Sequence, residues 1–153
     1  MKILKILFAL SLVVSLFCIG DIIFLLFFFE RMKELMGDTI ITDPNFWLER
    51  VVNFINCIGV FFITFGLWGA VLRNPFDVQA SMFIKIGGVL FLIASTILIC
   101  SDLYFIIVLN DQTHYTSLIT ADVMLLTIGV ATLFVADVLK SGILLKQEND
   151  LTI

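Results

Sequence analysis

The chain has 153 residues, of which 61% are hydrophobic and only 14% are charged. Its mean hydropathy of +1.14 lies far outside the range of soluble domains, in which roughly a quarter of the residues are charged. The net charge of -4 argues against nucleic-acid binding by the chain itself, because a phosphate-binding surface needs clustered Lys and Arg. These properties predict an integral membrane protein.

Four apolar blocks are each long enough to cross the hydrocarbon core, which takes about 20 helical residues. Because lipid offers no partner to an open backbone N–H or C=O, we expect helices and not strands. The predicted fold is an all-α integral membrane protein, an antiparallel bundle of four transmembrane helices at about residues 3–29, 46–72, 84–109 and 117–140. The connections are then an outer loop at 30–45, a cytoplasmic link at 73–83, an outer loop at 110–116 and a cytoplasmic tail at 141–153.

The first block follows Lys2 and Lys5 and in this respect resembles a secretory signal. No small-x-small cleavage site follows it, and the apolar run continues to Phe29, which is long for a signal core. We therefore expect this block to be retained as a membrane span.

The distribution of basic residues predicts the orientation. A cytoplasmic N-terminus would place six of them inside (Lys2, Lys5, Arg73, Lys85, Lys140 and Lys146) and three outside (Arg31, Lys33 and Arg50). The positive-inside rule therefore favours a multi-pass protein of the cytoplasmic (inner) membrane with both termini in the cytoplasm.

Both prolines of the chain are expected to open helices. Pro44 and Pro75 each follow an Asp or Asn that can cap a helix, and the fixed φ of proline suits the first helical position. The third helix should then start at Asn74 and Pro75, with Asp77 on its first turn. Lys85 would mark its entry into the membrane.

Two segments, NPFDVQASMFIKIGGVLFLI and the C-terminal VADVLKSGILLKQENDLTI, resemble the signature segments of a family of small bacterial four-helix membrane proteins, domain of unknown function 2975 (DUF2975). The chain departs from that pattern at Asn74, where a small residue is usual, and at Asp77, where Thr or Ser is common. The positions that match are Pro75, Phe76, Lys85, Gly87, Gly142, Leu145, Glu148, Asp150, Leu151, Thr152 and Ile153.

The resemblance brings with it no enzymatic activity. It implies a partner, a small helix-turn-helix regulator of the Cro/repressor type, which the membrane protein would control or hold. The two signature segments would be the cytoplasmic contact surface.

Five polar residues, at least one from each predicted helix, are expected in the outer half of the membrane: Asp21, Asn53, Asn56, Asp102 and Asp122. A charged side chain at the bilayer centre costs about 2.5 to 3.5 kcal/mol on insertion scales, so these groups should face the bundle interior. Arg50, about two turns further out, is the nearest expected counter-ion. Two interpretations stay open, namely a pocket that senses a cation, an amine or protons, and a structural hydrogen-bond layer that fixes helix register.

Small residues follow one face of the second helix (Gly59, Gly66 and Ala70) and one face of the first (Ser11, Ser15 and Cys18). Such faces let membrane helices approach closely. We expect packing within the chain, with a homodimer seam as the alternative. The three cysteines are expected to be packing residues, because they show no CxxC spacing.

Catalysis finds little support, since the chain shows no Ser/His/Asp set in a plausible arrangement, no metal-spaced His or Cys and no Gly-rich phosphate loop. We expect no cofactor and no metal. The main alternative to a regulator is a small cation or drug transporter that uses Asp21. The apolar patch at Ile143 to Leu145 is predicted to pack against the start of the third helix, near Phe76 and Met82, or to dock a partner.

Overall fold

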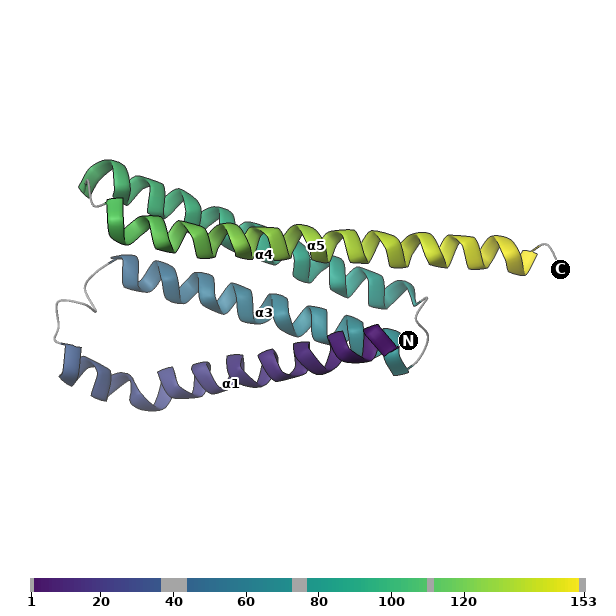
Figure 1. Cartoon of the computed structure of the whole chain (residues 1–153). Helices are drawn as coiled ribbons and strands as arrows, with labels where there is room; N and C mark the ends of the chain where they lie inside the picture. Colours follow the sequence, from purple (N-terminus) through teal and green to yellow (C-terminus); the bar gives the residue numbers. More distant parts are fainter. Residues whose placement is uncertain (1, 37–43, 73–76, 110–111, 152–153) are drawn as a thin grey trace.

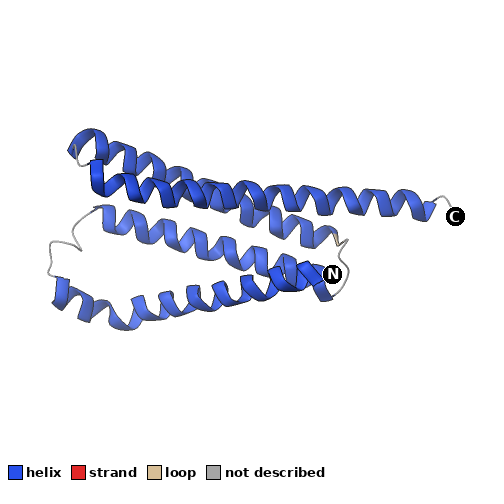
Figure 2. Ribbon diagram, in the orientation of Figure 1, coloured by secondary structure: helices blue, strands red, loops and turns tan. Residues whose placement is uncertain are grey.

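The computed structural model describes residues 2–36, 44–72, 77–109 and 112–151, which are helical except for Asp77. The helices are, in chain order, α1 (Lys2–Met36), α3 (Pro44–Leu72), α4 (Val78–Leu109) and α5 (Gln112–Leu151) (Figures 1 and 2). Each contains a stretch that is long and apolar enough to cross a membrane, respectively Lys2–Phe29, Phe46–Leu72, Val78–Val108 and Ile119–Asn149. The predicted all-α fold with four such helices is confirmed, and the described residues contain no strand.

Consecutive helices run in opposite directions, so the molecule has two distinct ends (Figure 1). One holds the beginning of α1, the end of α3, the beginning of α4 and the end of α5, and we call it the terminal end. The other, where α1 and α4 finish and α3 and α5 begin, is the loop end.

Helix starts agree with the sequence at one proline and differ near the other. Helix α3 begins at Pro44, as predicted. Asp77 is not on the first turn of α4 but precedes it, and its Oδ1 accepts a hydrogen bond from the backbone N–H of Gln79 at 3.0 Å. Asp77 is therefore the N-cap of α4, while Asn74 and Pro75 lie outside the described residues.

Helix α5 is the longest element, with 40 residues and a length of about 60 Å at 1.5 Å per residue. The segment predicted as a tail, 141–153, continues this helix to Leu151, and Thr152 and Ile153 lie outside the described residues. Lys146, Gln147 and Glu148 are good helix formers, and they sustain the helix past Gly142. The last turns of α5 project beyond the other helices at the terminal end (Figure 1).

Glycines bring α3 and α4 into very close contact. A Cβ atom added to Gly87 would lie 2.7 Å from the carbonyl oxygen of Gly59 and 2.5 Å from Cγ1 of Ile63. A Cβ added to Gly66 would lie 2.6 Å from Cγ1 of Ile84. The small-residue face of α3 is thus covered by α4 of the same chain, as expected for intramolecular packing.

The helices contact one another in chain order, α1 with α3, α3 with α4, and α4 with α5. Among the described residues, no Cα atom of α1 lies within 8 Å of one in α4 or α5. Near the terminal end, Leu4 and Phe8 of α1 pack against a buried cluster of Leu67, Ile84 and Ala136. Farther along, the Ser15 and Thr64 hydroxyls, 2.9 Å apart, join α1 to α3.

Candidate functional site

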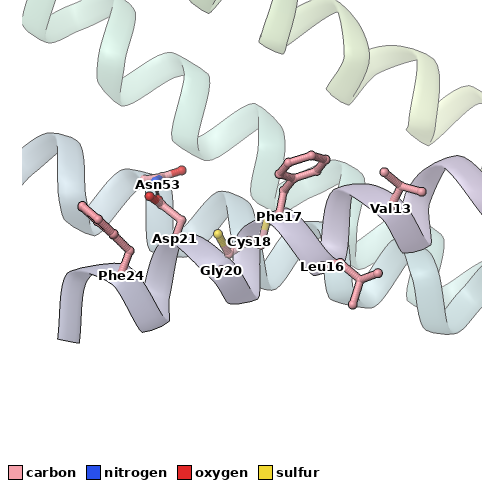
Figure 3. A pocket seen from close by; sticks show the side chains of 9 residues that line it. Val13, Leu16, Phe17, Cys18, Gly20, Asp21, Phe24 and Asn53 are labelled. Carbon is pink, nitrogen blue, oxygen red and sulfur yellow. Dashed lines mark hydrogen bonds between the residues drawn. The ribbon is translucent and has the colours of Figure 1, made fainter. Parts of the chain in front are cut away.

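Asp21 and Asn53 form a polar contact between α1 and α3. The Asn53 side-chain amide donates a hydrogen bond from Nδ2 to Asp21 Oδ2 at 2.8 Å (Figure 3). Both residues line an open groove of about 720 Å³, whose other walls are Val13, Leu16, Phe17, Cys18, Gly20, Phe24 and Cys57. The Asp21 carboxylate is therefore oriented by its neighbour and lies among apolar side chains.

Asp102 and Asp122 form a second polar contact, between α4 and α5. Their carboxyl groups are within hydrogen-bonding reach of each other, and the Glu49 carboxylate of α3 lies near them. A hydrogen bond between two carboxyl groups needs one proton, because an ionised carboxylate can only accept. Asp102 Oδ2 is buried and has no hydrogen-bond partner among the described residues.

These two contacts lie at different depths. Gly59 faces Gly87 in the α3–α4 pair. Asp102 lies about 22 Å beyond Gly87 toward the loop end, whereas Asn53 lies only about 9 Å beyond Gly59. The structure thus brings Asp21 to Asn53 and Asp102 to Asp122, and it separates the two pairs along the helix axes.

The charged residues near the site differ from those expected from the sequence in two respects, one at Glu49 and one at Arg50. Glu49 was not among the predicted site residues, although it lies four positions before Asn53 and so on the same side of α3. Arg50, the expected counter-ion, has its guanidinium over the ring of Phe46, 5.1 Å from the ring centre. That contact is a cation–π interaction near the loop end.

Asn56 lines a neighbouring cavity of about 610 Å³, to which all four helices contribute and which shares Cys18 and Asn53 with the groove of Asp21. Its Oδ1 atom is buried without a hydrogen-bond partner among the described residues. The walls are mainly aliphatic: Leu7, Ser11, Val14 and Cys18 from α1, Asn53, Val60, Ile63 and Leu67 from α3, Ile84 and Phe91 from α4, and Leu125, Ile128, Ala131, Thr132 and Val135 from α5.

At the terminal end, a smaller groove of about 360 Å³ separates the start of α4 from α5. Ile143 is buried there, and it lines the groove together with Met82, Lys85 and Lys140. The first part of the predicted apolar patch therefore does lie against the start of the third predicted span. Leu145, in contrast, is 66% exposed.

The family model described as "Protein of unknown function (DUF2975)" matches residues 50–153. The chain belongs to the DUF2975 family. The match covers α4, α5 and most of α3, including both segments that carry the resemblance, while α1 lies outside it. No curated protein and no solved structure matches the chain.

The described signature positions of this DUF2975 protein lie either in a helix contact or at the terminal end of the molecule. Gly87 packs against Gly59 and is a helix-contact residue. Lys85, Leu145 and Glu148 are exposed at the terminal end, and Gly142 is half-buried there. For Asp150 and Leu151 the structure describes the helical backbone alone, and Pro75, Phe76, Thr152 and Ile153 lie outside the described residues.

The described residues contain no group of three or more His, Cys, Asp or Glu side chains arranged to hold a metal ion. Cys18 and Cys57 lie beside each other in the α1–α3 groove. Both thiols are free.

Proposed function

We propose that this protein is a non-enzymatic membrane regulator whose terminal end binds a small helix-turn-helix transcription factor of the Cro/repressor type. The observation that carries the proposal is the projecting end of α5. Where α5 leaves the bundle, it presents the exposed apolar side chains of Leu144 and Leu145 beside the start of α4.

Three successive residues of α5 have very different surroundings. Ile143 is 6% exposed and packs toward α4, whereas Leu144 and Leu145 are 53% and 66% exposed. Val78 and Met82, at the start of α4, add exposed apolar surface beside Leu144. An exposed apolar patch rimmed by polar groups is typical of a protein contact surface.

This surface lies at the edge of the membrane or beyond it. Lys85 and Lys140 line the same groove and carry exposed side chains. Lysines near helix ends place their ammonium groups at the headgroups, so Leu144 and Leu145, which lie farther along α5, would face the aqueous side. In this proposal the candidate span Ile119–Asn149 leaves the membrane before Leu144, and a protein partner covers these two side chains in place of lipid.

The charge distribution supports a cytoplasmic location of this surface. The terminal end carries Lys2, Lys5, Lys85, Lys140 and Lys146, and the loop end carries Arg31, Lys33 and Arg50. Basic residues concentrate on the cytoplasmic side of membrane proteins. In this proposal both termini and the partner are in the cytoplasm of a bacterial cell.

The membrane part would sense through its polar groups. Asp122 and Leu144 lie on the same unbroken helix, about 33 Å apart. A change in the contact between Asp102 and Asp122 would therefore be passed to the partner surface as a movement of α5.

The test begins with affinity capture of the tagged full-length membrane protein from native membranes. The protein that co-purifies is then isolated, and its binding to the purified membrane protein is measured in detergent. We expect a small helix-turn-helix protein to co-purify and to rebind. The double variant Leu144→Glu, Leu145→Glu should abolish rebinding. Ser141→Ala, at an exposed position of the same helix that does not line this groove, should retain it. Equal rebinding by the double variant would overturn the proposal.

A second candidate, transport of small cations, is favoured by the open groove between α1 and α3, because the Asp21 carboxylate lies there among apolar side chains. Proteoliposomes that hold the purified protein would be assayed for proton-coupled efflux of an organic cation. Flux that disappears in Asp21→Asn would support transport and count against the regulator.

A further inference from the structure

The cavity of about 610 Å³ that Asn56 lines has walls from both α1 and α5 and has the length of one lipid chain. Its lining residues on α3 run from Asn56 to Leu67, and those on α5 run from Leu125 to Val135. These stretches measure about 17 Å and 15 Å. Half of a hydrocarbon core of about 30 Å is the same distance.

One polar atom in the walls of this cavity needs a hydrogen-bond donor. The Thr132 and Ser11 hydroxyls donate to backbone carbonyl groups of their own helices, and the Asn53 amide donates to Asp21. Asn56 Oδ1 is buried without a partner among the described residues. An unsatisfied acceptor in an apolar setting costs free energy until a donor reaches it.

The position and the composition of the walls restrict the charge of any occupant. Asn56 lies twelve residues past the start of α3, or about 18 Å from the loop end. Among the described residues, none that lines the cavity is Lys, Arg, Asp or Glu. A charged headgroup at this depth would be unpaired and costly, so the occupant carries no charge.

We propose that this cavity binds an uncharged, single-chain amphiphile, with its hydroxyl group donating to Asn56 Oδ1 and its apolar chain lying between α1 and α5 toward Leu67. A long-chain alcohol or a monoacylglycerol has this chemistry. The chain would contact both helices, whose backbones do not approach each other, and would thereby set the separation of α1 from α5. The idea that the separation of α1 from α5 is the signal sent to a partner rests on the proposed function. The binding of the amphiphile does not depend on that function.

The experiment uses the purified full-length protein in nanodiscs of phosphatidylethanolamine and phosphatidylglycerol. The probe is hexadecanol with a diazirine in its chain, compared with its methyl ether, which has no donor. After photolysis, mass spectrometry locates the labelled residues. We expect labelling of the cavity walls at Val14 and Ile128, stronger for the alcohol than for the ether by about threefold, as fits one hydrogen bond inside a membrane protein.

Two variants and one control sharpen the result. Asn56→Leu should remove the preference for the alcohol while chain labelling persists. Ala131→Phe, which fills the cavity, should reduce wall labelling about tenfold, whereas Val130→Phe, on an exposed position of the same helix, should leave it unchanged. If Ala131→Phe does not elute as a folded protein in size-exclusion chromatography, the test depends on Asn56→Leu alone. The measured quantity is then the ratio of labelling by the alcohol to labelling by the ether.

Equal labelling by alcohol and ether in the unmodified protein would overturn the proposal. So would a cavity filled by a phospholipid chain that the alcohol does not displace, or by a second copy of the chain, both visible in native mass spectrometry. No transcription factor is present in this assay, so failure of the partner proposal leaves its outcome unaffected.

Discussion

Gly87 and Gly59 show what single residues decide in this protein. Their helices pass so closely that even a methyl group at Gly87 would meet the backbone of α3. Nothing in the bilayer drives two apolar helices together as water would, so close packing must supply the attraction. Gly87 was identified from the sequence as a family signature position, and the structure gives it a physical reason.

Gly87→Ala should destabilise the protein by about 1 to 3 kcal/mol, because the added Cβ forces α3 and α4 apart. The measurement is unfolding of the purified protein in mixed micelles with increasing SDS, followed by helical circular dichroism. Gly20→Ala is the matched control, since an added Cβ there has no heavy atom within 4 Å. Its expected effect is neutral or stabilising by up to about 1 kcal/mol, and equal effects of the two variants would contradict the packing argument.

Asp21 and Asn53 should behave as a coupled pair. Asn53→Leu leaves the carboxylate without its donor in an apolar groove, whereas Asn53→Leu combined with Asp21→Leu removes both partners. The double variant is therefore expected to be more stable than Asn53→Leu alone, in the same unfolding measurement. Strictly additive effects would show that the hydrogen bond contributes nothing.

At the scale of helices, hydropathy and capping chemistry predict much of what the structure shows. Four apolar blocks correspond to four helices, and Pro44 starts α3 as predicted. The end of α5 was not foreseen, because Gly142 and the polar residues after it resemble a tail. A helix tolerates one glycine at a cost of about 1 kcal/mol, and no proline follows to end it.

The sequence alone singled out the polar residues of the candidate site. It predicts that all five polar residues lie in the outer half of the membrane, but it does not predict which of them contact one another. The shift of one helix along its neighbour depends on where glycines such as Gly87 let the two backbones touch. The hydropathy pattern of a single sequence does not reveal this shift. The two carboxylate contacts, Asp21 with Asn53 and Asp102 with Asp122, consequently lie apart.

Ser81 ties α4 to α5, since its hydroxyl donates to the Ala136 carbonyl at 2.9 Å in a buried position. Ser81→Ala should cost about 0.5 to 1.5 kcal/mol of unfolding free energy. Ser141→Ala is the control, because the exposed Ser141 hydroxyl bonds only to Asp137 of its own helix, and it should change little. A cost for Ser141→Ala as large as that for Ser81→Ala would contradict a role of Ser81 in joining the helices.

For the whole molecule, four antiparallel spans put both termini on one side, and the positive-inside rule predicts that this side faces the cytoplasm. Single added cysteines test this with a membrane-impermeant thiol reagent, because the native cysteines lie within spans. Glu34→Cys should react in intact cells. Gln147→Cys should react only after permeabilisation, and the opposite pattern would reverse the orientation.

Helix α1 has the least protein around it of the four helices that the structure describes. In its most apolar stretch only 6% of the residues are buried by other parts of the chain, against 11% in α5 and 33% in α3 and in α4. Lipid therefore solvates α1 almost entirely, and the helix can stay inserted without its neighbours. During biogenesis α3, α4 and α5 can assemble around their glycine contacts as a self-sufficient unit, and α1 can join that unit or leave it without unfolding.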